Sequence, residues 1–378
     1  MERKKICFVF ARPGVANGFL REPIKKLATK FDVYLASNFE DKPFEFDLPI
    51  KGYMDFPIQR KPTICNEIKT LRLLYKYFKK EKFFAVHSQA INASLLNSIA
   101  GWMARVPHRI RIFTGQVWYT MTGARRWFYR MLDKLTIRLN TELLVDGCPQ
   151  RKYLIEEKIL KEGQAEVLAK GSISGVDINR FNPSDIDREK ERHDLDLRPN
   201  HVVFTFMGRL KRDKGIYEIL EAFNNLCKEK TNAYLLIFGN DEEKVMDHIS
   251  EYNNIKDGIN FCYYGLTRKP EKSLQAADIF LLPSYREGFG VSAIEAACLG
   301  LPVICSDTYG MGETMIDDVT GLRCKVGDVD SLYQSMLRLY EDEQLRKRMG
   351  QLGRERILRD FSSEYVSGEW LHFYERLK

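Results

Sequence analysis

The sequence predicts an α/β protein with two doubly wound domains, each a parallel β-sheet covered by helices on both faces. Three observations support this fold class. The 378 residues exceed the size at which one hydrophobic core usually stops growing. Short apolar runs alternate with helical patterns along the whole chain, as in parallel sheets. The hydrophobic fraction of 44% supports well-formed cores.

The expected strands fall into two similar sets. In the first half of the chain they are residues 6–10, 33–36, 84–87, 110–113, 142–146 and 166–168. In the second half they are residues 202–206, 234–238, 259–263, 279–283, 302–305 and 321–325. The stretch 182–200 is polar and rich in charge, which suits a linker and the entry to a second domain. We therefore place an N-terminal domain at residues 1–182 and a C-terminal domain at residues 183–361.

Composition limits the cellular setting and the kind of partner. No run of about 18 apolar residues occurs, so we expect no membrane-spanning helix. Residues 1–5 lead straight into a strand without the features of a secretion signal, which predicts a cytoplasmic protein. The eight cysteines are scattered and suggest reduced thiols rather than disulfides or zinc ligands. A net charge of +7 is compatible with nucleic acid, an anionic membrane or phosphorylated substrates.

Two glutamates follow the apolar run that ends at Pro283. Glu287 would lie at the end of this strand and Glu295 inside the next helix. The first amides of that helix, at Val291 and Ser292, would have no intrahelical partner and would favour an anion. A phosphate with polyol groups on either side fits such a pocket. The alternative is that Glu287 caps the helix and Glu295 is an ordinary solvated acid.

A pair of cations follows the strand at 202–206. Arg209 and Lys214 stand between Gly208 and the start of a helical pattern at Ile216. Arginine offers a planar fork of donors and lysine a compact charge, so together they can hold the oxygens of a diphosphate. The alternative is a basic surface turn.

The C-terminal half carries a family resemblance, which rests on five segments. The segments are Gly208-Arg209-Leu210 with Lys214-Gly215, Tyr264-Gly265, Glu287 to Glu295, Gly300-Leu301-Pro302-Val303, and Thr320-Gly321-Leu322. Their order and spacing resemble the retaining, nucleotide-sugar-dependent glycosyltransferases of family 4. The resemblance implies the GT-B fold, in which two such domains face each other across a cleft. It also implies a C-terminal helix, residues 362–378, that packs back onto the first domain.

The resemblance implies a role for each matching residue. The catalytic set is Glu287, Arg209 and Lys214, and the donor-binding set is Gly208, Tyr264, Leu266, Phe289, Gly290, Val291, Ser292 and Glu295. Arg209 and Lys214 would bind the diphosphate, Glu287 the transferred sugar and Glu295 the ribose hydroxyls. Fixed cations and amides stabilise a departing diphosphate more in the transition state than in the ground state. Glu287 is the nearest candidate nucleophile, although we favour front-face attack.

The donor and the metal requirement follow from the same resemblance. Uridine diphosphate is the commonest donor nucleotide of the family, so we expect a UDP-sugar. Three Asp-x-Asp strings begin at Asp185, Asp194 and Asp328, and none follows a strand in a cleft position. We interpret them as surface acids, the last as a helix cap, and predict no metal and no other cofactor.

The acceptor would bind to the first domain. Family members have a histidine after a first-domain strand, where this chain has Thr114 and Gln116. This difference puts histidine-based catalysis in doubt. His87 ends the strand at 84–87 and is a further candidate, with a structural histidine as the alternative. The remaining acceptor-side candidates are Arg12, Gly14 and Gly18. The alternative is a plain turn with a solvated arginine.

Residues 118–138 interleave aromatic and basic side chains. Trp118, Tyr119, Trp127, Phe128 and Tyr129 alternate with Arg125, Arg126, Arg130, Lys134 and Arg138, and Lys76, Lys79, Lys80 and Lys82 add further charge. Such a face suits the inner surface of a membrane, with the protein bound peripherally. The acceptor would then be a lipid-linked saccharide, such as a polyprenyl-diphosphate intermediate of a surface polysaccharide. The alternative is an ordinary amphipathic helix with its aromatic residues in the core.

Two other functions compete with sugar transfer. The same fold class includes nucleotide-sugar epimerases and phosphorylases, but the sequence shows no lysine-centred pyridoxal phosphate site. A nucleic-acid-binding protein would use the basic first domain. No nucleic-acid-binding module is recognisable, so we expect no nucleic-acid partner.

Overall fold

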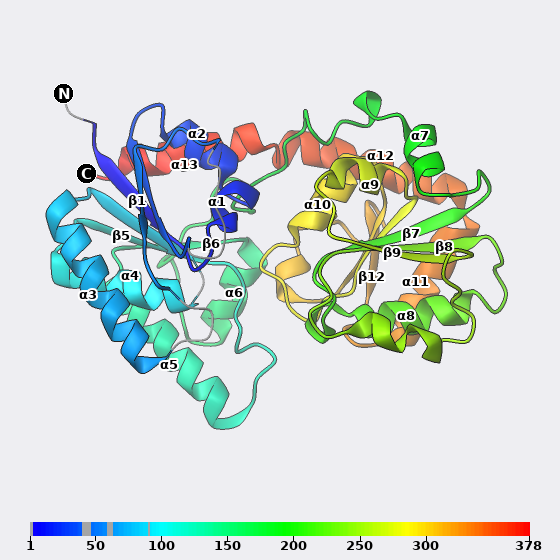
Figure 1. Cartoon of the computed structure of the whole chain (residues 1–378), viewed down its shortest axis with the longest axis horizontal. Helices are drawn as coiled ribbons and strands as arrows, with labels where there is room; N and C mark the ends of the chain where they lie inside the picture. Colours follow the sequence, from blue (N-terminus) through cyan, green and yellow to red (C-terminus); the bar gives the residue numbers. More distant parts are fainter. Residues whose placement is uncertain (1–2, 40–46, 59–62, 90) are drawn as a thin grey trace. The chain divides into compact units, whose positions relative to one another are not determined.

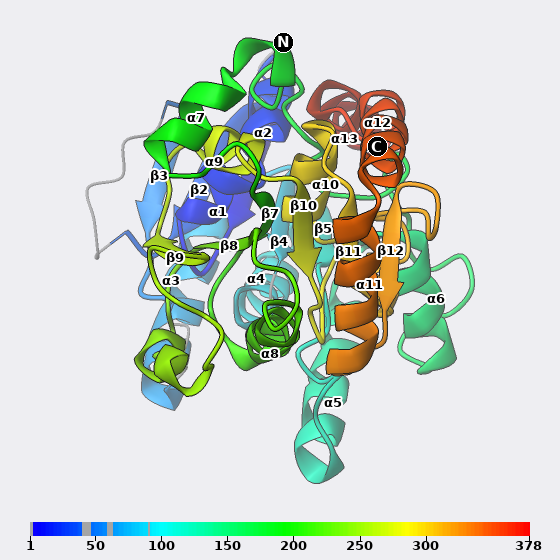
Figure 2. The same cartoon turned by 90° about the vertical axis from the view of Figure 1, so that its right-hand side faces the viewer.

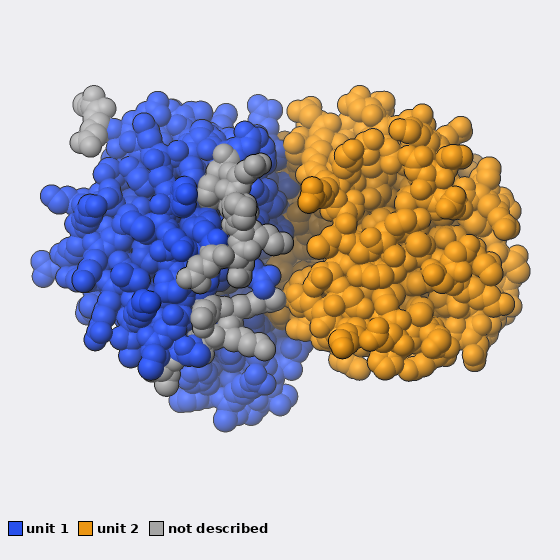
Figure 3. Space-filling model, viewed as in Figure 1, with its two compact units in different colours: residues 1–175, 363–378 blue, residues 176–362 orange. Residues whose placement is uncertain are grey.

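The computed structural model describes residues 3–39, 47–58, 63–89 and 91–378. The chain forms two compact units, Met1–Gly175 with Ser363–Lys378, and Val176–Ser362 (Figure 3). Each unit contains a six-stranded sheet in which all the paired strands are parallel. The strand orders are β3-β2-β1-β4-β5-β6 in the first unit and β12-β11-β10-β7-β8-β9 in the second. Both orders are those of doubly wound folds.

The first unit alternates strands and helices, as the sequence predicted. Its strands are β1 (Lys5–Val9), β2 (Asp32–Ser37), β3 (Gly52–Asp55), β4 (Ala85–Gln89), β5 (His108–Phe113) and β6 (Glu142–Val145). Its helices are α1 (Gly14–Gly18), α2 (Arg21–Leu27), α3 (Ile64–Glu81), α4 (Ile91–Ala104), α5 (Gly123–Leu139), α6 (Cys148–Glu156) and α13 (Ser363–Arg376). Figure 1 and Figure 2 show both sheets and their helices.

Alternate side chains of β1 enter two different cores. Ile6 and Phe8 pack in the cluster that contains Leu27 of α2 and Trp370 of α13. Cys7 and Val9 pack in the cluster that contains α3 and α4 residues such as Phe78. Because successive side chains of a strand point to opposite faces, helices cover both faces of the sheet. The segment Ser363–Arg376 thus completes a core of the first unit.

The second unit repeats the arrangement around one large core. Its strands are β7 (Val202–Met207), β8 (Ala233–Phe238), β9 (Phe261–Gly265), β10 (Ile279–Leu282), β11 (Val303–Ser306) and β12 (Gly321–Cys324). Its α-helices are α7 (Arg188–Asp194), α8 (Ile216–Leu226), α9 (Pro270–Gln275), α10 (Val291–Cys298), α11 (Val329–Glu341) and α12 (Glu343–Asp360). The 3-10 turns are η1 (Pro183–Asp185), η2 (Arg212–Lys214), η3 (Val245–Glu251) and η4 (Tyr309–Met311). Helix α8 packs against α11, and α10 packs against α9 and α12.

One expected strand is wrong and one observed strand was not expected. Residues 166–168 form no strand, and only an isolated bridge joins Leu144 to Glu166. The sixth strand of the first sheet is instead β3, an edge strand that pairs with β2. Three of its four residues are exposed, so it lacks the apolar run by which the other strands were recognised.

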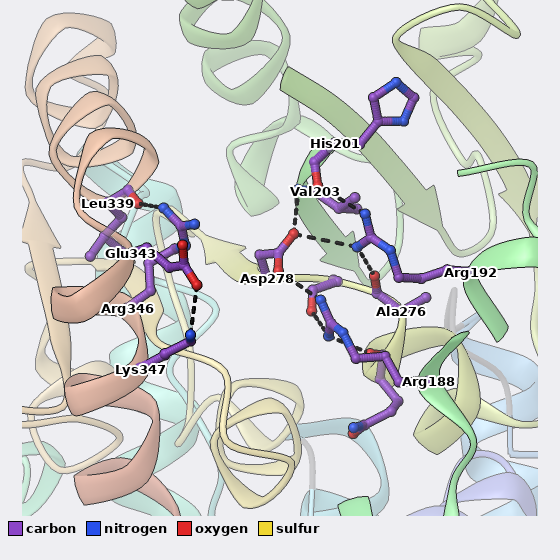
Figure 4. A network of polar contacts seen from close by, with 12 residues as sticks. Arg188, Arg192, His201, Val203, Ala276, Asp278, Leu339, Glu343, Arg346 and Lys347 are labelled. Atoms are coloured by element: carbon purple, nitrogen blue, oxygen red, sulfur yellow. Dashed lines mark hydrogen bonds and ion pairs between the residues drawn. The ribbon is translucent and has the colours of Figure 1, made fainter. Parts of the chain in front are cut away.

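A polar network fastens α7 to the amino end of β10 (Figure 4). Arg192 donates to the carbonyls of Ala276 and His201, each at 2.9 Å. Asp278 binds Arg188 at 2.7 Å and accepts the backbone N–H of Val203 at 2.8 Å. Both terminal nitrogens of each arginine donate to carbonyl or carboxylate oxygens, so the network holds α7 on the second unit.

Candidate functional site

The predicted donor residues gather at one edge of the second sheet. Gly208 directly follows β7, Gly265 ends β9, and the segment that contains Glu287 follows β10. Because the strands are parallel, their carboxyl ends meet at the same edge. This is the edge at which open α/β sheets bind ligands.

A partly buried cation and carboxylate form the centre of this site. Lys214 Nζ lies 2.5 Å from Glu287 Oε1, although 73 residues separate the two in sequence. Ser284 Oγ donates to the same carboxylate oxygen at 2.9 Å. Both charged side chains are largely shielded, with exposed fractions of 18% and 13%. The structure thus brings together two of the three predicted catalytic residues.

Local backbone geometry holds these two segments together. Gly215 has φ +71°, and a Cβ there would lie 2.3 Å from the carbonyl oxygen of Pro283. Only glycine allows the lysine turn to come so close to the end of β10. Tyr285 N–H donates to the carbonyl of Asp213 at 3.0 Å, and Arg286 forms an ion pair with the Asp213 carboxylate at 3.3 Å. These contacts fix the position of Lys214 relative to Glu287.

The third predicted catalytic residue, Arg209, lies at the same edge but has a different partner. Its guanidinium forms an ion pair with Glu242 at 3.1 Å. The pair is partly exposed and lies after β7 and β8, where a Cβ on Gly239 would come within 1.7 Å of the Gly208 carbonyl oxygen. This close approach and a φ of +137° explain why glycine follows β8 at position 239.

Helix α10 begins at the site with its amides unpaired by side chains. Gly290 has φ +76° and precedes Val291, and no side chain caps this helix start. The first amides of an α-helix lack intrahelical acceptors, so those of Val291 and Ser292 suit an anion. The Phe289 side chain is buried, and its carbonyl accepts a hydrogen bond from Thr314. The Phe289 carbonyl is therefore already engaged within the protein.

Glu295 lies in α10 without a hydrogen bond or ion pair among the described residues. The residue is partly exposed, but its carboxyl is desolvated. Burial raises the pKa of Glu295 to about 7, while the Arg180 charge opposes this rise. A carboxylate in this setting gains from hydroxyl donors that a ligand supplies.

Tyr264 and Leu266 of the predicted donor-binding set lie on the surface. Tyr264 stacks on Phe238 with ring centroids 5.5 Å apart, and its hydroxyl donates to the Leu195 carbonyl at 3.2 Å. Leu266 is exposed, with 77% of its surface accessible. Both side chains have accessible surface that a ligand could contact.

The acceptor-side candidates of the first unit divide by burial. Arg12, Gly14 and Gly18 are exposed at α1, and Thr114 after β5 is partly exposed. Gln116 is buried and accepts a hydrogen bond from Gln150 at 3.0 Å. These two glutamine side chains tie the loop after β5 to α6.

His87 is completely buried in the first unit. Its ring packs 5.0 Å from both Phe8 and Trp370, and Nδ1 lies 3.3 Å from the Tyr374 hydroxyl. Burial lowers the pKa of His87 to about 3, so the imidazole is neutral at physiological pH. The geometry is that of a structural histidine, the alternative weighed above.

The aspartates of the Asp-x-Asp strings have other roles. Asp328 is the N-cap of α11 and accepts from the Ser331 amide, as predicted, and Asp187 caps α7 in the same way. Across residues 3–39, 47–58, 63–89 and 91–378, no three histidine, cysteine, aspartate or glutamate side chains are grouped to hold a metal ion. In the same ranges, no helix combines the length and apolarity required to cross a membrane.

Several residues that shape the site were not predicted. Ser284 and the Asp213–Arg286 pair flank Lys214 and Glu287, and Glu242 holds Arg209. The only indication of them in the sequence was that each lies shortly after a predicted strand. Their side-chain partners could be identified only once the loops were placed.

Comparison with known proteins identifies the second unit. Residues 187–356 match the protein family "Glycosyl transferases group 1". The chain carries a glycosyltransferase group 1 domain. The match covers every predicted donor-site residue of this glycosyltransferase, from Gly208 to Glu295.

Related glycosyltransferases extend over most of the chain. The capsular polysaccharide biosynthesis glycosyltransferase CapM of Staphylococcus aureus is 28% identical over 356 residues, which cover 94% of this chain and 93% of CapM. The UDP-Gal:alpha-D-GlcNAc-diphosphoundecaprenol alpha-1,3-galactosyltransferase of Escherichia coli is 27% identical over 313 residues, 79% of each chain.

The solved structure of Anabaena HepE in complex with UDP and glucose superposes with a TM-score of 0.79. It is 16% identical in sequence, and the superposition covers 100% of both chains. This likeness and the two parallel sheets show the GT-B fold for the glycosyltransferase.

Proposed function

We propose that this glycosyltransferase moves a hexose or N-acetylhexosamine from a UDP-sugar to a lipid-linked saccharide in surface polysaccharide synthesis. The observation that carries the proposal is the Lys214–Glu287 pair at the edge of the sheet, next to the unpaired start of α10. In this proposal Lys214 binds phosphate and Glu287 binds sugar hydroxyls, on either side of the glycosidic bond of the donor.

The chemistry follows from the charge that develops on the leaving group. As the bond between sugar and diphosphate breaks, negative charge grows on the phosphate oxygens. Lys214 retains two further N–H donors beside its Glu287 contact, and the amides of Val291 and Ser292 add oriented dipoles. These groups stabilise the departing diphosphate. Arg209 would join them by exchanging its Glu242 partner for phosphate.

The role of Glu287 follows from its contacts. Its carboxylate is held by Lys214 and Ser284, so it is positioned to accept hydrogen bonds from sugar hydroxyls. Ion pairing lowers the nucleophilicity of a carboxylate. We therefore propose front-face attack by the acceptor with retention of configuration, rather than a covalent glycosyl-enzyme. Nuclear magnetic resonance of the product would give the anomeric configuration directly.

The identity of the donor and the acceptor is supported by the relatives. The name of the Escherichia coli relative specifies UDP-galactose and a diphosphoundecaprenol acceptor, and HepE was solved with UDP. We propose the same chemical classes here, with acceptor binding by the first unit near Arg12 and Thr114. The protein would then act at the inner surface of a membrane. We propose that no metal is required, so chelation with EDTA should leave turnover unchanged.

The proposal is tested by transfer assays with a panel of UDP-sugars and lipid-linked acceptors. Glu287→Gln, Lys214→Ala and Arg209→Ala should each reduce kcat by about a hundredfold, since one charged transition-state contact contributes about 3 kcal/mol. Lys256→Ala changes an exposed lysine on the same unit and should leave kcat unchanged. Normal turnover in all three site variants would exclude the mechanism.

Thermal stabilisation tests the donor base independently of turnover. A nucleotide that binds the folded state at 100 times its Kd stabilises it by about 2.7 kcal/mol. UDP should therefore raise the melting temperature more than ADP or GDP at equal concentration. A larger shift with another nucleotide would replace uridine in the proposal.

A further inference from the structure

Helix α5 presents large apolar side chains to solvent. Trp127, Phe128, Met131 and Leu135 are exposed, Trp127 at 64% and Phe128 at 52%. At 3.6 residues per turn these four side chains lie within an arc of about 100°. The buried residues Asp133, Thr136 and Ile137 lie on the opposite side of the helix. A continuous apolar stripe is thus accessible along α5.

The predicted aromatic and basic segment divides into an internal and an external set. Trp118 is completely buried and donates from Nε1 to Asp133 at 2.6 Å. Arg126 and Arg130 both bind Glu157 and lie over the Trp118 ring. These three side chains are part of the first unit's own structure. The alternative of core aromatics therefore holds for Trp118 but not for Trp127 and Phe128.

The external set keeps its charge. Arg125, Lys134 and Arg138 form no ion pair within the described part of the chain, and they flank the apolar stripe. Residues 91–141 contain seven arginines and one lysine but a single acid, Asp133. That acid is buried and paired with Arg111. Glu157 pairs with Arg126 and Arg130, but α5 itself has no accessible acid to offset the charges of Arg125, Lys134 and Arg138.

The position of α5 makes this surface available. Only Asn140 and Thr141 separate its C-terminal end from β6, so that end is tied to the sheet. The N-terminal end, which carries Trp127 and Phe128, projects from the first unit in both views (Figure 1, Figure 2). Trp102 and Met103 are exposed on α4, which packs against α5, and the exposed lysines of α3 include Lys76 and Lys80.

We infer that this α5 surface, formed by Trp127, Phe128, Met131, Leu135, Arg125, Lys134 and Arg138, docks the protein on a bilayer that contains anionic lipids. Aromatic and apolar side chains enter the headgroup region while flanking cations bind phosphate. A second copy of the chain is a poor partner, because pairing two such surfaces would bring cations together. The inference rests on the proposed function in one respect: an enzyme that uses a lipid-linked acceptor has to bind the membrane that holds it.

Flotation of the full chain with vesicles tests the docking surface. The protein should float with phosphatidylcholine vesicles that contain phosphatidylglycerol, less so at high salt, and not with phosphatidylcholine alone. The pair Trp127→Ser and Phe128→Ser should reduce the bound fraction by about tenfold, and so should the triple change Arg125→Glu, Lys134→Glu and Arg138→Glu. Arg126 and Arg130 stay unchanged, because their loss would disturb Glu157 and Trp118.

Matched controls come from the second unit. Ile259→Ser removes an equally exposed apolar side chain, and Lys256→Glu reverses an exposed charge, so neither should alter flotation. All variants should keep the wild-type far-ultraviolet circular dichroism and urea midpoint, which shows that both units are folded. Quenching of tryptophan fluorescence by lipids with brominated acyl chains should fall in Trp127→Phe.

Four results would overturn the inference. The first three are a wild-type chain that stays unbound at low salt, variants that float as well as wild type, and variants that turn a dimer into a monomer in sedimentation. Much tighter binding of this surface to nucleic acid than to vesicles would also overturn it. Transfer assays separate this test from the proposed function. If the chain floats as expected but glycosylates only soluble acceptors, the docking surface stands and the lipid-linked acceptor fails.

Discussion

Arg209 and Lys214 each have a carboxylate partner in the structure. The two carboxylates should have different effects on donor binding. Glu287 lies beside the sugar in the proposed complex, whereas Glu242 would only compete with the diphosphate for Arg209. Removing the Glu242 charge should therefore strengthen donor binding.

Glu242→Gln should lower the Kd for UDP by up to about fivefold, since a partly exposed ion pair contributes about 0.2–1 kcal/mol. Isothermal titration calorimetry measures the change, with Glu229→Gln as an exposed acid on the same unit for control. Weaker binding in Glu242→Gln would show instead that Glu242 orients Arg209 toward the phosphates.

Glu295 makes donor binding depend on pH. Its raised pKa of about 7 means that the carboxyl is protonated below this pH and charged above it. The charged form accepts stronger hydrogen bonds from ribose hydroxyls. Affinity for UDP should rise as the pH increases from 6 to 8, about as the fraction of charged Glu295 rises.

Glu295→Gln provides the comparison. Ionisation of the nucleotide itself affects both proteins equally, so the difference between their pH profiles reports Glu295 alone. The variant should bind more weakly at pH 8 and vary less between pH 6 and 8. Parallel profiles for the two proteins would remove Glu295 from the ribose site.

The sequence was sufficient to predict that Lys214 and Glu287 share one edge of a sheet, because each follows a strand and parallel strands end together. It was not sufficient to predict Glu242 or the Asp213–Arg286 pair. Side-chain partners depend on where two loops from different strands come to lie, and no periodic pattern records that. The burial of His87 could not be predicted from the sequence either, because His87 packs against Trp370 and against Tyr374, which is 287 positions away in sequence.

At the scale of elements, the turn before α8 depends on Gly215. Gly215→Ala should destabilise the protein by about 1–3 kcal/mol or more, because the new Cβ meets a positive φ and the Pro283 carbonyl. It should also weaken UDP binding by displacing Lys214. Gly258→Ala is the control, since Gly258 has φ +70° but nothing within 4 Å of its Cβ. Equal effects of the two changes on urea unfolding would contradict the role assigned to the close contact.

Helix α13 is the second element whose loss should be measurable. Trp370 is fully buried and donates from Nε1 to the Ile173 carbonyl at 2.9 Å. Trp370→Ala should lower the free energy of unfolding by about 3–5 kcal/mol. His372→Ala on the exposed side of the same helix should change it by less than about 0.5 kcal/mol. Urea denaturation of both variants checks this, and a small effect at Trp370 would mean that α13 adds little to the core.

Strand prediction succeeded where a run of buried residues was long enough to recognise. β8 is buried at all six positions and β10 at all four, so their sequences are almost purely apolar. Three of the four residues of edge strand β3 are exposed, so its sequence has no apolar run and resembles that of a loop. The apolar residues Val167 and Leu168 each pack against a core of the first unit, which needs no strand.

At the scale of the whole molecule, two units with separate cores should respond differently to the donor. UDP should slow amide hydrogen exchange at residues 208–215 and 287–295 of the second unit. It should leave β1 of the first unit unchanged, since those amides are already in the middle of a sheet. Hydrogen exchange with mass spectrometry checks this, and protection restricted to the first unit would place the donor there instead.

The return of α13 to the first unit has a consequence for how the protein is made. A ribosome releases residues 176–362 before residues 363–376, so the second unit can finish folding while the first still lacks a helix. Nascent domains usually mature in the order of synthesis. Here the order is reversed, because the core of the first unit lacks Trp370 and Tyr374 until residues 363–376 have left the ribosome.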